Sequence, residues 1–363
     1  MGFRGIQPPT FVGLRAQRVL LTKSCLRRIV KQNQSGRKDT GMRVGFIGLG
    51  NVGAKLAGSL IRNGFDVMVR DTDEAAAKSL LEGGARWAES GRALAEACDV
   101  IVTCLPSPKV SAQVLEEKDG VLDGITPGKI WLEMSTTEAA DVQRLGAQVE
   151  ARGGIAMDSP VSGGCHRAST GNIAIFAGGR REAFEKVLPL LTTMGRQVVH
   201  TGKLGSASVL KVITNYLAGV QLLSTGEAFM VARKAGVDLA VAYHAIRVSS
   251  GNSFVHETEG QLILNGSYNI NFTMDHEVKD VTLFDDLGKS FGVPLELSPV
   301  CVAAMNDGLK RYGPRVWSSQ VVKRLEDDCG MDLRAPGFPE YLVDHEPEGK
   351  GAEVVVEHRR GYE

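Results

Sequence analysis

In the first half of the chain, short apolar segments alternate with longer segments rich in Ala and Leu. From Met42 onward, four apolar segments have the length of a β-strand, at residues 44–47, 67–69, 100–104 and 130–132. This alternation predicts a doubly wound parallel sheet, because parallel strands need helical crossovers between them. Further strand signals, each bounded by Gly or Pro, follow at residues 155–157, 173–176 and 198–199. We therefore expect the sheet to extend to about residue 200.

Beyond Gly205 the spacing of apolar positions changes to that of helices, and no convincing strand follows. The apolar segments lie at residues 209–232, 239–248, 281–291 and 299–309. Residues 206–234 contain no Pro, so we expect one long helix that leads out of the first domain. The tail at residues 334–363 is rich in Gly, Pro and charge, with one β-like patch at 354–356, and we expect a mobile end.

Charge is distributed unevenly along the chain. The 363 residues include 42 basic and 42 acidic side chains, but residues 1–41 hold nine Lys or Arg and one Asp. The rest therefore carries a net charge of −8, which argues against a nucleic-acid partner, because phosphate binding needs clustered basic side chains. No apolar segment approaches the roughly 18 residues of a membrane span, so we expect no membrane partner. A small molecule is the expected partner.

The six cysteines are scattered along the chain and form no CxxC motif. That usage is typical of reduced thiols that serve as small apolar side chains. We expect neither a disulfide framework nor a metal site.

The basic N-terminal segment has the composition of an organellar transit peptide, rich in Arg and nearly free of acids. Its serines are few, which favours a mitochondrial matrix address over a plastid one. The alternative is a solvated basic tail, or an extension upstream of a start at Met42, and a cytoplasmic protein. We expect residues 1–41 to be the transit peptide.

A glycine loop follows the first predicted strand and precedes a helix-forming segment. Its residues are Gly48, Leu49, Gly50, Asn51, Val52 and Gly53. The first glycine permits a tight turn, the second leaves room for a pyrophosphate, and the third lets helix and strand pack closely. A lone GxGxxG is often a plain turn, but the strand and helix around this one are those of a dinucleotide-binding loop.

Asp71 makes the dinucleotide interpretation more specific. It lies 23 residues beyond Gly48, at the end of a predicted strand. An acid there accepts hydrogen bonds from the adenosine ribose hydroxyls and repels a 2′-phosphate, which favours NAD over NADP. NADP stays open, because the neighbouring Arg70 is able to pair with that phosphate if Asp71 turns away.

Two local patterns suggest where the chemistry takes place. Lys211 and Asn215 are four residues apart in the predicted long helix and project from one face, although a snorkelling lysine is the alternative. Ser162, Gly163 and Gly164 follow a predicted strand, where backbone N–H groups and a hydroxyl form a concavity suited to a carboxylate. By itself that sequence is more often an ordinary loop.

Taken together, these motifs resemble the β-hydroxyacid dehydrogenase family, which includes 3-hydroxyisobutyrate dehydrogenases and the glyoxylate, succinic semialdehyde and tartronate semialdehyde reductases. The resemblance covers about residues 43–310. GFIGLGNVG is similar to the family's cofactor loop, and DSPVSGG to its substrate loop. The remaining similar segments are Leu105-Pro106, Ser135-Thr136, residues 205–215 and Lys279-Asp280.

The resemblance implies roles for these residues. Lys211 is the expected general acid/base, Asn215 orients the substrate, and Ser162, Gly163 and Gly164 hold its carboxylate. Leu105, Pro106, Thr136 and Lys279 are expected at the cofactor, in addition to the glycine loop and Asp71. The implied fold is α/β, with a Rossmann NAD(P)-binding domain at residues 42–203 and a smaller all-helical domain at 204–333, joined by the long interdomain helix. The family also implies a cleft between these domains, and a homodimer or homotetramer that pairs through the helical domain. The extended tail at residues 334–363 follows these domains.

Departures from the family pattern and competing functions remain. Val110 and Thr214 replace polar residues of the family, and Cys165-His166-Arg167 follows the substrate loop, where we expect a solvent-facing loop.

A mitochondrial address favours 3-hydroxyisobutyrate as the substrate. The alternatives are an NADPH-dependent glyoxylate or succinic semialdehyde reductase, and a non-catalytic dinucleotide-binding scaffold, against which the presence of Lys211 counts.

Overall fold

The structure, a computed structural model, describes residues 41–356. The expected transit peptide, apart from Gly41, lies outside these residues. The described residues belong to one compact unit. Within them, no helix is long and apolar enough to cross a membrane, and no group of three or more His, Cys, Asp or Glu is arranged to hold a metal ion.

One ten-stranded sheet organises the first part of the described chain, in the order β10-β9-β8-β6-β5-β4-β1-β2-β3, with β7 paired to β8 off this path. The strands are β1 (Arg43–Ile47), β2 (Asp66–Arg70), β3 (Arg86–Trp87), β4 (Val100–Thr103), β5 (Ile130–Glu133), β6 (Ile155–Asp158), β7 (Val161–Ser162), β8 (Ile173–Gly178), β9 (Gly195–Gly202) and β10 (Ala352–Glu353). Each of the seven predicted strands is present. The unpredicted ones, β3, β7 and β10, have two residues each, too few for a periodic signal.

The sheet is parallel except at β8, which runs antiparallel to β6 and β7. The predicted doubly wound parallel sheet is confirmed, with an antiparallel junction at β8 that the sequence did not predict. The physical reason is the short connection between β7 and β8, residues 163–172, whose helix α8 (Gly164–Ser169) is too short to carry the chain back to the opposite end of the sheet.

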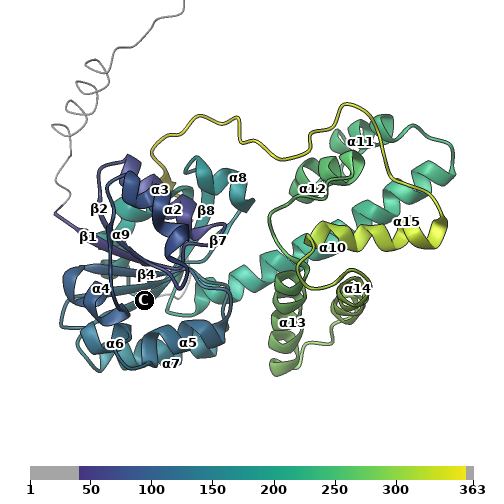
Figure 1. The fold of residues 1–363 in the computed structure, drawn as a ribbon. Coiled ribbons are helices and arrows are strands. Elements are labelled where there is room, and N and C mark those ends of the chain that lie inside the picture. Colours follow the sequence, from purple (N-terminus) through teal and green to yellow (C-terminus); the bar gives the residue numbers. More distant parts are fainter. Residues whose placement is uncertain (1–40, 357–363) are drawn as a thin grey trace, which may run out of the picture. The chain divides into compact units, whose positions relative to one another are not determined.

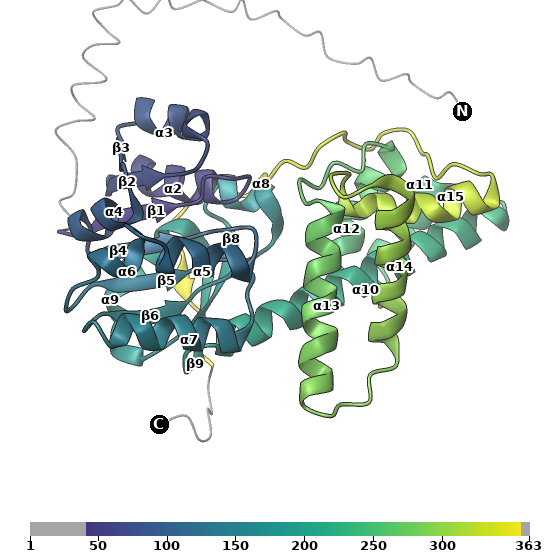
Figure 2. The same ribbon diagram turned by 60° about the horizontal axis from the view of Figure 1, so that its bottom comes forward.

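Helices cover both faces of the sheet, as a doubly wound fold requires (Figures 1 and 2). One core joins the sheet to α2 and α9 through Phe46, Leu56 and Phe184, and another joins it to α4 and α7 through Trp131 and Leu145. The remaining elements here are α2 (Gly53–Arg62), η1 (Glu74–Ala77), α3 (Lys78–Glu82), α4 (Gly91–Ala97), α5 (Pro108–Glu116), α6 (Val121–Gly124), α7 (Ala139–Glu150) and α9 (Arg181–Met194). The predicted fold class is confirmed.

The helical part begins with α10 (Ser206–Lys234), whose bounds coincide with the predicted long helix. It continues with α11 (Leu239–Arg247), α12 (Phe254–Asn265), α13 (Met274–Ser290), α14 (Leu297–Tyr312), η2 (Ser318–Val322) and α15 (Lys323–Cys329). Its core is separate from those of the sheet and includes Phe229, Val281 and Met305. The sequence did not predict α12, because Glu257, Glu259 and Gly260 interrupt the apolar pattern of this segment. The domain boundary between residues 203 and 204 stays a prediction.

The expectation of a mobile C-terminal end is wrong for the described part of the tail. Ala335 and Phe338 pack against the helical core, and β10 pairs in parallel with β9. The strand lies at Ala352–Glu353 and not at 354–356. Polar composition suggested solvent exposure, but the partners of this segment lie far away in sequence.

Candidate active site

The glycine loop has the geometry of a pyrophosphate cradle. A side chain at Gly48, where φ is +95°, would place Cβ 2.3 Å from the carbonyl oxygen of Cys104, and one at Gly53 would place it 2.0 Å from that of Gly48. At Gly50 an added Cβ meets no heavy atom within 4 Å, so the space above the loop is open. Helix α2 then begins without a side-chain cap or an acid in its first turn. Its N–H groups suit a bound anion, and the residues present fit a dinucleotide.

Asp71 contacts this loop directly. Its Oδ2 accepts a hydrogen bond from the backbone N–H of Leu49 at 2.6 Å. The guanidinium of Arg70 instead donates to the carbonyl oxygens of Ala88 and Glu89, at 3.1 Å and 2.6 Å. Arg70 is therefore engaged away from Asp71, which leaves the carboxylate at the end of β2 as the charge that faces the loop.

Buried hydrogen bonds hold the segments after β4 and β5, which carry Leu105, Pro106 and Thr136. The N–H of Leu105 donates to Ser135 Oγ at 2.7 Å, and the N–H of Ser135 donates to Glu133 Oε1 at 2.8 Å. Glu133 is fully buried, and burial raises the pKa of its carboxyl. Sequence reasoning missed this glutamate, although an acid that ends an apolar strand was the available signal.

The substrate-loop candidate requires glycine for conformational reasons. Gly163 and Gly164 adopt φ values of +124° and +84°, which residues with a side chain rarely adopt. His166 and Arg167, expected in a solvent-facing loop, lie in helix α8, which corrects that expectation. Both are half-buried, and the guanidinium of Arg167 lies 5.0 Å from the ring centroid of Phe254. Both side chains have a partner in Phe254 of α12, which local sequence does not reveal.

Lys211 lies in a buried polar group between α10 and α13. Its Nζ donates to Asn215 Oδ1 at 2.7 Å, and the amide of Asn215 donates to Asp280, which also pairs with Lys279. Only 8% of Lys211 is exposed. Burial lowers the pKa of its amine to about 8, while the charge of Asp280 opposes that change. An amine with this pKa is able to give and take a proton near neutral pH.

Sequence reasoning missed two further carboxyl groups, Glu277 near this lysine and Glu259 near Glu277. Glu277 is 7% exposed, and among the described residues its Oε1 has no hydrogen-bond partner. Burial, with the charges of Glu259 and Asp280, raises the pKa of Glu277 well above its usual range. Burial likewise raises the pKa of Glu259 to about 8. The charge of Glu277, like that of Asp280, opposes the lowering of the Lys211 pKa by burial.

The candidate residues are brought together through the helical part. Lys279 Nζ donates to the carbonyl oxygen of Thr136 at 3.2 Å. The carbonyl oxygen of Asn271 accepts from Asn51 of the glycine loop at 3.3 Å and from the thiol of Cys165 in α8 at 3.8 Å. Strand β7, which carries Ser162, packs against α10.

In the described part of the chain, the lysine and the substrate-loop candidate are not joined directly. Within residues 41–356, Lys211 makes no hydrogen bond to Ser162, Gly163 or Gly164. Hydrogen bonds and an ion pair thus connect Lys211, Asn215, Asp280, Lys279 and Thr136 into one group. Separately, Asn271 of the helical part contacts both the glycine loop and α8.

Comparison with known families covers most of this architecture. Residues 43–202 match the family described as the NAD binding domain of 6-phosphogluconate dehydrogenase. Residues 205–325 match the family described as NAD-binding of NADP-dependent 3-hydroxyisobutyrate dehydrogenase. The two matches meet close to the beginning of α10.

Individual relatives agree with these matches. The chain is 31% identical to 2-(hydroxymethyl)glutarate dehydrogenase of Eubacterium barkeri, over 80% of this chain and 97% of that protein. It is also 31% identical to mitochondrial 3-hydroxyisobutyrate dehydrogenase of Rattus norvegicus, over 71% and 79%. A crystal structure of 3-hydroxyisobutyrate dehydrogenase from Salmonella typhimurium superposes with a TM-score of 0.72 at 31% identity, covering 78% of this chain and 99% of that one. The motifs, the fold and these relatives agree: the chain belongs to the β-hydroxyacid dehydrogenase family of NAD(P)-dependent oxidoreductases.

Proposed function

We propose that this protein transfers a hydride between NAD and a short β-hydroxyacid or its semialdehyde, with Lys211 as the general acid/base. The observation that carries the proposal is the buried Lys211 amine, hydrogen-bonded to Asn215 and with its pKa lowered to about 8. A general acid/base works best when its pKa lies near the working pH.

The residues divide the work as follows. When bound, the nicotinamide supplies the hydride in reduction or accepts it in oxidation. In reduction, Lys211 Nζ gives a proton to the carbonyl oxygen, and in oxidation the neutral amine accepts the hydroxyl proton. Asn215 holds that amine in place, and Asp280 holds Asn215. Ser162, Gly163 and Gly164 bind the substrate carboxylate through the hydroxyl and backbone N–H groups.

The remaining candidates hold the cofactor. The glycine loop, residues 48–53, and the start of α2 receive the pyrophosphate, while Leu105, Pro106, Thr136 and Lys279 line the nicotinamide end. NAD is favoured over NADP because Asp71 faces the loop and Arg70 is engaged with two carbonyl oxygens. A 2′-phosphate close to Asp71 would be repelled by the carboxylate.

For the substrate and location, we propose 3-hydroxyisobutyrate and the mitochondrial matrix. The support is the basic composition of residues 1–41 and the similarity to the mitochondrial enzyme of Rattus norvegicus. A fluorescent reporter fused to residues 1–41 tests the address, and a diffuse cytoplasmic signal would contradict it.

Light scattering tests the proposed homodimer or homotetramer, which a monomer would contradict.

A second candidate function has specific support. Two proteins of Arabidopsis thaliana named glyoxylate/succinic semialdehyde reductase are 27% and 28% identical to this chain. A screen of small hydroxyacids and semialdehydes with NAD(H) and NADP(H) separates the two functions. Faster reduction of glyoxylate or succinic semialdehyde with NADPH would favour this alternative.

The decisive test of the mechanism is Lys211→Ala. We expect turnover to fall about 10²-fold to 10⁴-fold, because a positioned general acid/base contributes that much. The dissociation constant of NADH, measured by fluorescence, is expected to stay unchanged. Lys234→Ala is the control, since this lysine is exposed at the end of the same helix and donates to the carbonyl of Cys329. Unchanged turnover in Lys211→Ala would remove the assignment, whereas absence of any turnover in the wild-type protein would favour a non-catalytic scaffold.

A further inference from the structure

The described tail forms a strap, defined here as residues 333–353, that is anchored at two places. Its first anchor is in the helical part, where the N–H of Leu333 and the guanidinium of Arg334 both donate to the carboxylate of Glu326. The N–H of Ala335 donates to a carbonyl of α12, and the Phe338 ring packs edge-on against Tyr243 at 4.9 Å. The family match ends at residue 325, so the whole strap lies beyond it.

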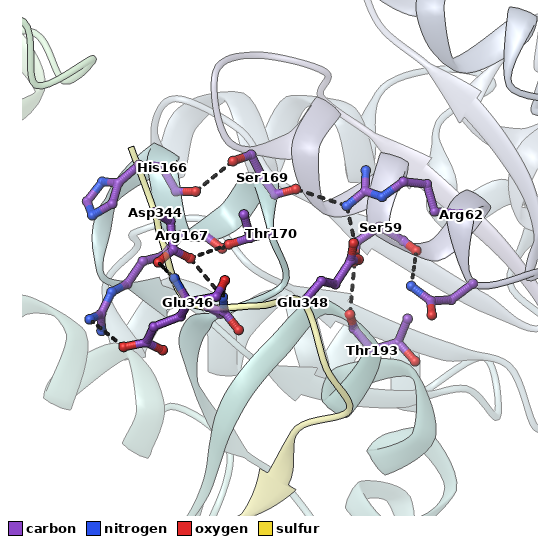
Figure 3. Close-up of polar contacts among 12 residues, drawn as sticks. Ser59, Arg62, His166, Arg167, Ser169, Thr170, Thr193, Asp344, Glu346 and Glu348 are labelled. Carbon is purple, nitrogen blue, oxygen red and sulfur yellow. Dashed lines mark hydrogen bonds and ion pairs between the residues drawn. The ribbon is translucent and has the colours of Figure 1, made fainter. Parts of the chain in front are cut away.

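The second anchor is at the end of helix α8 (Figure 3). The carboxylate of Asp344 accepts hydrogen bonds from the hydroxyl of Thr170 and, at 2.8 Å, from the amide of Asn172. The same amide donates to the carbonyl of Glu346 at 2.9 Å. The Glu346 carboxylate pairs with Arg167 of α8 at 3.4 Å. Asp344 thus accepts two hydrogen bonds from the segment that directly follows α8, whereas Glu346 accepts one.

Beyond Asp344, the strap continues along the sheet. Glu348 pairs with Arg62 of α2 at 3.2 Å, and Arg62 also donates to the carbonyl of Ser169 at the end of α8 at 2.9 Å (Figure 3). Strand β10 then extends the sheet, where Glu353 pairs with Arg181. These contacts connect the strap, α2 and the last turn of α8 into one network.

Helix α8 matters because it begins at Gly164, directly after Ser162 and Gly163. Its first turn contacts the helical part through Cys165, and its middle packs on Phe254. With only six residues, the helix has little stability of its own and depends on such contacts. Whatever holds its last turn therefore also holds the loop at its beginning.

We propose that the strap is a positioning element for the substrate loop, with Asp344 as its central residue. The inference rests on the proposed function, in which residues 162–164 bind the substrate carboxylate. The strap keeps α8 seated on α2 and the sheet, and this fixes the direction of the N–H groups of the loop. Small displacements of binding groups are costly, because substrate and catalytic groups must meet at near-contact geometry.

The two anchors explain how contacts that are exposed to solvent are able to hold α8 in place. Isolated surface ion pairs contribute little to stability. Here residues 339–343 connect the anchor at Phe338 to Asp344, and this short connection makes docking an intramolecular step with a high effective concentration. Several weak contacts then act together.

The test uses three variants of the full chain. Asp344→Ala removes the acceptor for Thr170 and Asn172. Asp344→Asn keeps an acceptor oxygen for both and loses only Oδ1, which accepts the N–H of Glu346 within the strap. Glu340→Ala removes an exposed charge from the connecting segment. We expect Asp344→Ala to raise the KM of the hydroxyacid about 5-fold, with kcat and the NADH dissociation constant within about 2-fold of wild type. Amide hydrogen exchange across residues 163–172 is expected to become faster. Asp344→Asn and Glu340→Ala are expected to behave as wild type.

The outcomes separate this inference from the proposed function. Wild-type exchange and wild-type KM in Asp344→Ala would overturn the strap's role, while Lys211→Ala still tests the chemistry. Faster exchange with an unchanged KM would also overturn the inference, because α8 then moves without affecting the substrate. If Asp344 only stabilised the fold, Asp344→Ala would lower kcat and weaken NADH binding together. A raised KM with unchanged kcat and unchanged NADH binding excludes that role. If the wild-type protein turns over no hydroxyacid, the proposed function fails and exchange alone reports on α8.

Discussion

The carboxylate of Asp158 accepts hydrogen bonds from both the backbone N–H and the hydroxyl of Ser208, at 2.7 Å and 3.0 Å. It also accepts the N–H of Gly205 at 2.9 Å. Asp158 ends β6 and begins the substrate-loop motif, whereas Ser208 lies in the first turn of α10, three residues before Lys211. One buried carboxylate thus connects the strand that leads to the proposed substrate loop with the helix that carries the proposed catalytic lysine.

Removing this connection is expected to affect both stability and catalysis. Asp158→Ala leaves buried N–H groups at the start of α10 without an acceptor, which costs about 2 kcal/mol of unfolding free energy or more. We also expect kcat to fall, because Lys211 is one turn away. Asp238→Ala is the matched control, since Asp238 caps the exposed start of α11 by accepting the N–H of Val241. It is expected to cost about 1 kcal/mol with kcat unchanged.

Urea denaturation and steady-state kinetics check this pair. Equal losses of stability and kcat in both variants would mean that Asp158 is an ordinary cap without a special link to Lys211.

The pH dependence of turnover is expected to follow the Lys211 amine, whose pKa burial lowers to about 8. Oxidation needs the neutral amine, so kcat/KM in that direction rises with pH and levels off above about 8. Reduction needs the charged amine, so kcat/KM falls above the same pH. Profiles measured in both directions check this, with Lys211→Arg as a variant that stays charged and loses the inflection. Inflections of the same sign in both directions would contradict the role.

Asp280 is expected to tune that inflection. Its negative charge opposes the lowering of the Lys211 pKa by burial. Asp280→Asn therefore shifts the inflection to lower pH in both directions of the reaction. Asp286→Asn removes the same charge from an exposed position on α13 and is expected to leave the inflection in place. A shift to higher pH in Asp280→Asn would be inconsistent with this electrostatic account.

Glu259 is expected to make the folded state less stable as pH rises. Burial raises the pKa of its carboxyl from 4.5 to about 8, so the folded protein favours the protonated form. The favourable contribution is complete below about 4.5 and is lost as pH rises through about 8. Glu259→Gln removes this loss, so its melting temperature relative to wild type increases between pH 5 and pH 9, by roughly several degrees.

Differential scanning calorimetry at several pH values checks this expectation. Glu340→Gln, at an exposed position, is expected to change in parallel with wild type. A constant difference between Glu259→Gln and wild type at all pH values would show that the carboxyl ionises normally.

Cofactor choice is expected to depend on Asp71 and not on Arg70. Asp71→Ala removes the carboxylate that faces the glycine loop, so the ratio of kcat/KM for NAD to that for NADP falls about 10-fold or more. Arg70→Ala changes the ratio by less than about 2-fold, because the guanidinium is engaged with the carbonyls of Ala88 and Glu89. A selective loss of NADP turnover in Arg70→Ala would show that Arg70 reaches the 2′-phosphate after all.

Local sequence was sufficient for the main strands, the long helix and the glycine loop. Apolar periodicity depends only on which face each residue presents to the core, and it placed α10 at its observed bounds. The glycines were equally predictable, because a positive φ at Gly48 or Gly163 and the absence of a Cβ are properties of single residues. Lys211 and Asn215 were found as a pair because helical spacing alone brings them onto one face.

The buried carboxylates and the strap depend on contacts that span the chain. Asp158 meets Ser208 across 50 residues, and Asp344 meets Thr170 across 174. The lowered pKa of Lys211 and the raised pKa of Glu277 arise because α10, α12 and α13 exclude water around them. Desolvation and pairing of charges depend on which groups the folded chain packs together, and no local pattern of polar and apolar residues encodes that. The same reason explains why a polar, Gly- and Pro-rich tail, expected to be mobile, is bound at both ends of the part that the structure describes, at Arg334 and at β10.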